Sequence, residues 1–485
     1  MLFVVCLALA TVVSAVSSLN VALPSIARST HAGQTELAWI VDAYSLVFAA
    51  LLLFAGAIGD RFGRRRALSI GLALFGMGAA AAMLDANAHW LIAMRGLLGV
   101  GAALVMPATL STITSTFPAD QRARAVGTWA GVAGASAILG LVTSGLVLEV
   151  WSWRSVFLLS VLLSVAALIG TLIVVPESAD PDAPRLDVVG AVLTVVGLGA
   201  LVYSIIEAPN AGWLSARTVL GLVGGLIVMA GFVAWELRCD HPLVDPTLFR
   251  LRGFTAGSLT ITFQFFAFFG FIFLMLQYLQ LLLGNGPLRS ALSMLPLAAG
   301  LMPFARVVGP RVAARIGSAR ASSIGLVLAA AALGWLSRLD AGSPYWELLV
   351  GLVPLGAGMG LAMTPATAAI TDALPAEQQG VGSAMNDLAR ELGGALGIAV
   401  VASIAQSVYR SHVVVSGLPS GVAARVRDSF ALATRLGHPV ARHADSAFVD
   451  GMRIALLSGA AVLLATAVAV AAIGIDHLPL RAHNT

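Results

Sequence analysis

Long apolar runs alternate with short polar segments along the whole chain. Most runs have about 20 residues, enough for a helix rising about 1.5 Å per residue to cross a hydrocarbon layer of about 30 Å. The pattern predicts an all-α polytopic membrane protein with about 14 transmembrane helices. The expected spans are 3–24, 38–59, 68–88, 90–115, 125–149, 155–176, 188–208, 217–237, 253–283, 291–309, 321–338, 346–371, 381–409 and 451–475.

The composition also indicates a membrane protein. Of the 485 residues, 59% are hydrophobic and 11% are charged, whereas a soluble domain has about 25% charged residues. The net charge of +4 could suggest a nucleic-acid partner, but the arginines are scattered through short loops without a basic face, which argues against one. The two cysteines lie in an apolar run and a polar loop, so we expect no disulfide, and we expect no metal or cofactor.

A short, highly charged hairpin separates the second and third expected spans. Gly59 and Gly63 allow a sharp turn and close helix packing, and Asp60 stands where a helix ends. One interpretation is an ordinary turn held in the cytoplasm by its positive charge. The other, favoured by the particular order of residues, is a cytoplasmic gate formed by Gly56, Gly59, Asp60, Arg61, Gly63, Arg64, Arg65 and Arg66.

The distribution of arginine predicts the orientation. Apart from the long segment 410–450, the loops on the side of Arg61 carry most of the loop arginines, so this hairpin and both chain ends are expected in the cytoplasm. The segment 410–450 then lies on the opposite side. Its pattern predicts an amphipathic hairpin, which we interpret as a lid or a structural cap.

Part of the sequence is repeated in the same order. Residues 99–109 return as 356–367, and 61–63 return weakly as 315–317, whereas 188–252 have no counterpart. The repeat predicts an N-terminal six-helix bundle at 1–187, two inserted transmembrane helices at 188–252, and a C-terminal six-helix bundle at 253–485 that includes the extracytoplasmic hairpin 410–450.

The hairpin at 56–66 resembles the signature loop of the major facilitator superfamily, G-x-[LI]-[AG]-D-R-x-G-R-[RK], whose members contain parallel six-helix repeats. Over its full length the chain resembles the fourteen-span branch, mostly drug:proton antiporters. The resemblance implies a secondary active exporter of hydrophobic or cationic small molecules in the bacterial cytoplasmic (inner) membrane, driven by proton antiport with alternating access. Its partners would be the substrate, protons and the lipid bilayer, and we expect a monomer. Asp60 would face the start of the span 381–409.

Ionisable residues at membrane depth are the main candidates for proton coupling, because each is costly there. Arg95 lies in a segment that resembles the family motif R-x-x-x-G-x-G, which implies a role in proton transfer; the alternative is an arginine that extends to the membrane surface. Asp42 lies in the outer part of the second span, either as a protonatable group or as an interfacial residue.

A second group of candidates lies in the span 381–409. Asp387 and Glu391 are four residues apart and share a helix face, and Arg390 is three residues from Asp387, within reach of an ion pair. The cluster is either structural or a proton-exchanging site coupled to substrate binding. The proton-coupling candidates are therefore Asp42, Arg95, Asp387, Arg390 and Glu391.

The span 253–283 contains seven phenylalanines, too many for all of them to line one cavity. By the repeat it begins the second half, and the resemblance implies that such a helix lines the central cavity. The predicted contacts of an apolar or aromatic substrate are Gln264, Phe265, Phe268, Phe269, Gln277 and Asn386.

Two departures from the family pattern leave alternatives open. Ala15 stands where the fourteen-span exporters usually carry an aspartate, and Leu141 stands where their fifth-span motif has a proline. These changes favour a carrier for a lipid or an endogenous metabolite, without proton coupling. A non-transporting membrane sensor or scaffold is a further alternative. The sequence shows no enzyme constellation and no phosphate-binding loop, so we expect a transporter energised by an ion gradient rather than an enzyme.

Overall fold

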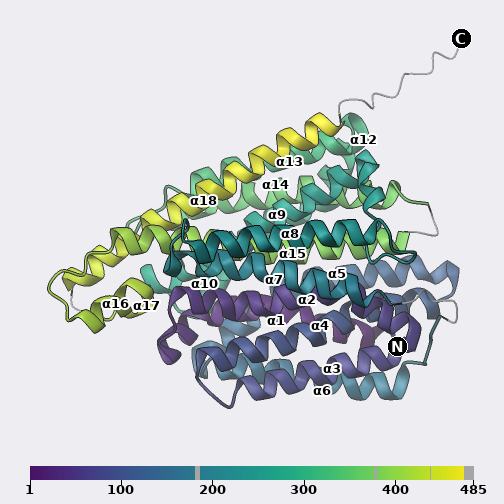
Figure 1. The fold of residues 1–485 in the computed structure, drawn as a ribbon, viewed down its shortest axis with the longest axis horizontal. Coiled ribbons are helices and arrows are strands. Elements are labelled where there is room, and N and C mark those ends of the chain that lie inside the picture. The colour runs from purple at the N-terminus through teal and green to yellow at the C-terminus, as the bar shows by residue number, and fades with distance from the viewer. Residues whose placement is uncertain (181–185, 376–378, 437, 475–485) are drawn as a thin grey trace, which may run out of the picture.

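The computed structural model describes residues 1–180, 186–375, 379–436 and 438–474. These residues form an elongated bundle of helices, and no strand occurs among them (Figure 1). Met1 and the last turn of α18 lie at the same end of the bundle, whereas α16 and α17 project at the other end. We call the end where α2 meets α3 the arginine-rich end and the opposite one the hairpin end.

The first six helices pack around α1 and α4. α1 lies against α5 and α6, while α2 and α3 both pack on α4. Their bounds are α1 (Leu2–Thr30), α2 (Gln34–Phe62), α3 (Arg64–Ala82), α4 (Ala88–Thr116), α5 (Ala119–Val150) and α6 (Arg154–Val174).

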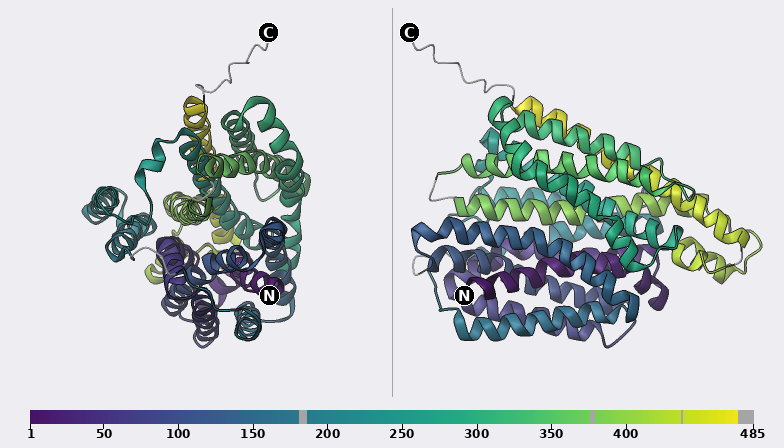
Figure 2. Two further views of the ribbon diagram at one scale, coloured as in Figure 1. Left: turned by 90° about the vertical axis from the view of Figure 1, so that its right-hand side faces the viewer. Right: turned by 180° about the vertical axis from the view of Figure 1, so that it is seen from behind.

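Two helices then form a separate pair, α7 (Val188–Ala211) and α8 (Ala216–Glu236). Asp187 caps α7 and Ser215 caps α8, each accepting a backbone N–H bond from the first turn. α7 contacts α2 and α15, but only 11% of the apolar window of α8 is buried, so α8 faces the lipid. The end-on view shows the pair at the periphery of the bundle (Figure 2).

The remaining helices pack around α9, α14 and α15. Prolines interrupt the run 287–316, because each removes a backbone donor and clashes with the preceding turn. The bounds are η1 (Pro246–Arg250), α9 (Arg252–Gln277), η2 (Tyr278–Leu282), α10 (Pro287–Ser293), α11 (Leu295–Pro303), η3 (Phe304–Val308), α12 (Gly309–Ile316), α13 (Ser318–Leu336), α14 (Tyr345–Asp372), α15 (Gln379–His412), α16 (Ser420–Asp428), α17 (Phe430–Ala433) and α18 (His438–Gly474).

The expected hairpin at 410–450 includes only the last residues of α15, which ends at His412. α18 begins at His438, inside the expected loop, and the short helices α16 and α17 close the connection. Phe430 stacks on Phe448 with ring centroids 4.3 Å apart, and Tyr409 packs edge-on against Phe430. These buried aromatic contacts fix the two long helices to each other beyond the bundle.

The all-helical membrane fold is confirmed. In the described part of the chain, 13 helices are long and apolar enough to cross a membrane. The expected span 68–88 is not among them, because its helix α3 begins with three arginines that lower the mean hydropathy. The number of spans, the cytoplasmic placement of the chain ends and the division at 187 and 252 stay predictions.

Candidate functional site

The charged turn between α2 and α3 is anchored to the segment after α6. Gly63 has a φ of 119°, in the region that favours glycine. Asp60 accepts a 2.8 Å hydrogen bond from Arg64 one turn on, and its backbone oxygen accepts one from the Asp180 amide. Glu177 accepts a bond of 3.1 Å from the Arg65 backbone amide. The turn is therefore held in place by a network rather than by charge alone.

Other residues of this turn contribute packing and charge. Gly56 lies against Pro107 of α4, and Gly59 lies against Ala67 of α3. Arg66 pairs with Glu177 at 3.6 Å, and Arg61 lies near the ring of Phe62.

Arg95 is directed into the bundle rather than toward the membrane surface. Its side chain is 1% exposed. The Nε atom donates a 2.9 Å hydrogen bond to the Ile40 carbonyl oxygen, and the guanidinium carbon lies 4.3 Å from the centre of the Tyr44 ring. Gly99, one turn on, lies directly against the α2 backbone at Tyr44. The motif thus brings α4 close enough to α2 for Arg95 to reach a backbone carbonyl and an aromatic face.

Asp42 is fully buried, and neither carboxyl oxygen has a hydrogen-bond partner among the described residues. Ile40 and Tyr44, which contact Arg95, are each two residues from Asp42 along α2. Two residues correspond to a rotation of about 200° around the helix, so Asp42 faces away from Arg95. The structure therefore does not bring these two candidates together. An ionised Asp42 would have no counter-ion in this arrangement.

The α15 cluster divides between two spaces. An Arg390 nitrogen lies 3.6 Å from an Asp387 oxygen, and the guanidinium lies over the Phe265 ring at 5.0 Å. Arg390 and Glu391 line a central cavity, whereas Asp387 lines a separate vestibule. Asn386 lines neither; it accepts a 3.0 Å hydrogen bond from Thr367.

The central cavity has a volume of about 210 Å³ and lies between the first six helices and the second group. Phe265, Phe268 and Phe269 form one wall, with ring centroids 5.5–6.1 Å apart. Residues that the sequence did not indicate complete the lining, mainly Val12, Val16, Asn20, Tyr44, Phe48, Met106, Ile138, Ile272 and Met294. The lining follows no single periodic pattern, because seven helices contribute to it, namely α1, α2, α4, α5, α9, α11 and α15.

Two of the predicted cavity contacts lie elsewhere. Gln264 is buried and donates a 3.2 Å hydrogen bond to the Met359 carbonyl oxygen of α14. Gln277 is also buried and donates to the Phe273 carbonyl oxygen of its own helix. Neither residue lines the central cavity. Ala15 is buried without lining the cavity, whereas Leu141 does line it.

A vestibule of about 610 Å³ opens at the arginine-rich end and shares Met106 with the central cavity. Its lining includes Asp60 of α2 and also Val381 and Ser383 of α15, so it lies between the two halves. The acidic residues Asp60, Asp180, Asp187 and Asp387 line it, and no arginine occurs among its described lining residues. Asp187 accepts hydrogen bonds from the Gly190 amide and the Trp235 indole.

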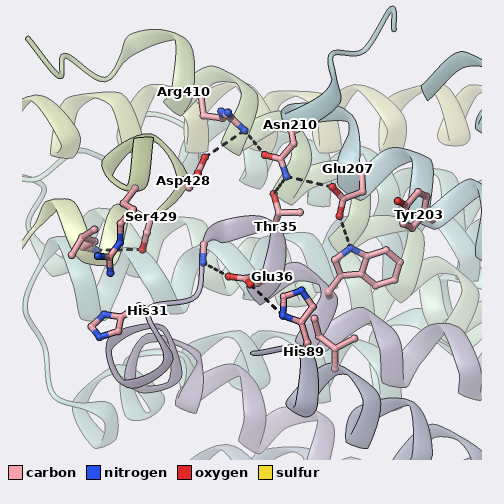
Figure 3. A pocket seen from close by; sticks show the side chains of 15 residues that line it. His31, Thr35, Glu36, His89, Tyr203, Glu207, Asn210, Arg410, Asp428 and Ser429 are labelled. Carbon is pink, nitrogen blue, oxygen red and sulfur yellow. Dashed lines mark hydrogen bonds and ion pairs between the residues drawn. The ribbon is translucent and has the colours of Figure 1, made fainter. Parts of the chain in front are cut away.

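At the hairpin end a third pocket, of about 810 Å³, lies where three parts of the chain meet (Figure 3). The Trp39 indole of α2 donates to Glu207 of α7 at 3.1 Å. Asn210 of α7 accepts a bond from Arg410 of α15, which also pairs with Asp428 at 3.5 Å. These contacts link the first six helices, the inserted pair and the hairpin on that side.

A membrane-spanning helical bundle with a central cavity between two groups of helices is typical of membrane transporters. The chain matches the family model described as Major Facilitator Superfamily over residues 5–398, and it belongs to that family. The resemblance stated from the hairpin is thus confirmed.

Relatives of similar length are resistance and export proteins. The chain is 34% identical to the multidrug resistance protein Stp of Mycobacterium tuberculosis (strain CDC 1551 / Oshkosh), covering 92% of this chain and 86% of that protein. It is 33% identical to the tetracenomycin C resistance and export protein of Streptomyces glaucescens, covering 93% and 87%. Similarity to such proteins supports drug export.

Solved structures show the same fold. A bacterial homologue of the human lysosomal transporter Spinster aligns with a TM-score of 0.66 at 17% identity, covering 97% of this chain and 96% of that one. A peptide transporter of the POT family aligns with a TM-score of 0.64 at 16% identity, covering 99% and 98%.

Proposed function

We propose that this protein exports hydrophobic cations across the bacterial cytoplasmic membrane in exchange for protons. The observation that carries the proposal is an acidic vestibule beside a phenylalanine-lined cavity, with Met106 in both linings and Glu391 in the lining of the cavity. Carboxylates around a cleft raise the local concentration of cations. Aromatic faces then bind a flat organic cation by burial and by cation–π attraction.

Contacts between the two halves support an inward-open state. Three cross-half hydrogen bonds lie at the hairpin end, from Gln280 to Val21, from Ser429 to Ala32 and from the Leu288 amide to Glu149. At the arginine-rich end the vestibule separates α2 from α15. In alternating access this cavity would close inside, with the turn at Asp60 as gate, and open outside.

Proton coupling is assigned to the buried carboxyls. Asp42 has no partner among the described residues and Glu391 faces the cavity, so each would bind or release a proton as the cavity opens to one side or the other. Arg95 and Arg390 would act as fixed positive groups on α4 and α15.

The test is transport in inside-out vesicles with an imposed pH gradient. Ethidium should accumulate in vesicles with an acidic interior, and nigericin, which collapses the gradient, should abolish the accumulation. Accumulation that ignores the gradient would disprove proton coupling.

The apolar lining, with Leu141 in place of the family proline, favours one second candidate, a carrier for a lipid or an endogenous metabolite. Expression in an efflux-deficient host separates the two. Reduced susceptibility to cationic compounds supports the exporter, and no change across the panel supports the carrier. A sensor or scaffold would bind ethidium without any flux.

A further inference from the structure

A separate pocket at the arginine-rich end lies within the second half of the chain. It has a volume of about 640 Å³ and is surrounded by the starts of α9 and α13 and the ends of α14 and α18. Arg250, Arg252 and Arg320 line it, all with exposed side chains, and Asp372 is the one acidic residue among its described lining residues. Within the described ranges, no carboxylate pairs with Arg250 or Arg320.

Two helices begin at this pocket without a side-chain cap. α9 follows Leu251 and α13 follows Gly317, and neither preceding residue accepts a capping bond. The first N–H groups of a helix lack partners within the helix and carry partial positive charge. Uncapped helix starts beside arginines are therefore a setting for an anion.

The first half shows the same geometry with an anion in place. Gly63 begins α3 as Gly317 begins α13, and Arg66 and Arg320 each lie three residues after that glycine. At α3 the Glu177 carboxylate accepts from the Arg65 amide at 3.1 Å and pairs with Arg66 at 3.6 Å. At α13 the corresponding place opens into the pocket.

The volume of this pocket and its apolar lining residues indicate which kind of anion would fit. A volume of about 640 Å³ far exceeds one carboxylate side chain. Apolar residues form the side toward α18, with Val470 and Ile473 in the lining. Exposed Ile324 and Val468 continue that apolar surface along α13 and α18. A ligand that fits has a phosphate at its polar end and an apolar body.

We propose that this pocket binds a phosphate ester, in the membrane the headgroup of an anionic phospholipid. Arg250 and Arg320 contact the phosphate together with the starts of α9 and α13, while the acyl chains follow α13 and α18. A basic pocket between helices at the cytoplasmic surface has the charge and position to hold such a headgroup. The site is independent of the transport cavity, so it stands whatever the substrate proves to be.

The test is native mass spectrometry of the full-length protein with phosphatidylglycerol or phosphatidylcholine added. Phosphatidylglycerol should remain bound at collision energies that remove phosphatidylcholine. The double variant Arg250→Gln with Arg320→Gln should lower the phosphatidylglycerol-bound fraction at least about fivefold. The matched control is Arg311→Gln, an exposed arginine of α12 outside the pocket, which should leave it unchanged.

Competition by inorganic phosphate distinguishes binding of a free phosphate from binding of a phospholipid headgroup. Displacement at millimolar concentration shows that a free phosphate suffices, and resistance shows that the acyl chains contribute; either result supports the pocket. Equal binding of both lipids, or an equal loss in Arg311→Gln, overturns the proposal.

Discussion

At the level of single residues, two buried charged groups on neighbouring helices have opposite surroundings. Arg95 is compensated by the Ile40 carbonyl and the Tyr44 ring. Asp42, on the other side of α2, has no partner among the described residues. A buried carboxyl without a counter-ion is costly when ionised. The environment of Asp42 therefore suits a group that binds and releases a proton during a transport cycle. The contacts of Arg95 suit a charge that stays in one place.

Replacing Asp42 with asparagine should uncouple export from the proton gradient. The initial rate of gradient-driven ethidium accumulation should fall at least about tenfold, as expected when a proton-transfer group is removed. Equilibrium binding of ethidium should change little, because Asp42 does not line the cavity. Ser45→Ala, also buried on α2, is the control and should transport normally. Undiminished coupling in Asp42→Asn would remove this residue from the mechanism.

Replacing Glu391 with glutamine should weaken the binding of cations and spare uncharged compounds. Glu391 faces the cavity beside the phenylalanines, so its charge acts on a bound ligand. The dissociation constant for ethidium should rise about tenfold, equivalent to about 1.4 kcal/mol. That for uncharged N-phenyl-1-naphthylamine should stay the same. Asp387→Asn, one turn earlier but facing the vestibule, should affect binding less; an equal effect of both variants would contradict the assignment.

At the level of elements, α4 is held against α2 by glycines in the segment that contains Arg95. A Cβ added at Gly99 would lie 2.6 Å from the Tyr44 carbonyl oxygen, whereas one added at Gly96 would meet Val47 at 4.0 Å, an ordinary contact. The spacing of glycines in the sequence therefore has a direct structural meaning. It sets the distance between the two helices that hold Arg95.

Gly99→Ala and Gly96→Ala make a matched pair on α4. The Gly99 variant forces α4 away from α2 and should destabilise the protein by about 1–3 kcal/mol, the usual cost of overpacking. The Gly96 variant should be neutral or stabilising by up to about 1 kcal/mol, because alanine is the better helix former. Thermal unfolding in detergent measures both, and equal melting temperatures would show that α4 tolerates the displacement.

At the level of the whole molecule, the two halves meet at the hairpin end and separate at the arginine-rich end. A Cβ on Gly145 of α5 would lie 3.1 Å from the Ala291 Cβ of α10, in the opposite half. A cross-link there would hold the hairpin end shut. Transport by alternating access requires this contact to open in every cycle.

The double variant Gly145→Cys with Ala291→Cys, made without Cys6 and Cys239, tests this requirement. The Cβ separation of 3.1 Å is shorter than the roughly 3.5–4.5 Å of a disulfide, so the two helices must move apart slightly when the bond forms. Oxidation should abolish ethidium transport, and reduction should restore it. Gly76→Cys with Ser164→Cys joins α3 to α6 within one half, where a Gly76 Cβ would lie 3.3 Å from the Ser164 Cβ, and should transport in both states. Transport by the oxidised cross-half variant would rule out rocking of the halves.

Much of the fold could be read from the sequence. Apolar runs of spanning length predicted the helices, and the order of residues around Asp60 indicated the family. Both signals are local, because helix formation in lipid depends on length and apolarity. The predicted helix boundaries were less accurate where an apolar run contains charged residues or prolines, as at the start of α3 and in 287–316.

The composition of the site could be predicted only in part. Phe265, Phe268, Phe269, Arg390 and Glu391 were singled out and do line the cavity. The sequence could not place Gln264 on the α14 side of its helix, or separate Asp387 from Glu391, because residues one turn apart on a helix share a face but not a depth. Asp180 lies in a loop and lines the vestibule because of how the chain folds, which the periodicity of apolar residues does not indicate.

The sequence by itself determined which segments enter the membrane and which family they form, since both follow from local patterns of apolarity and from one short motif. The tertiary structure alone decided which faces of α2, α9 and α15 meet across the two halves. It also decided that Asp42 is enclosed without a partner while the vestibule carboxylates gather around one opening. These are properties of contacts between distant segments, and their energies depend on distance and enclosure rather than on sequence order.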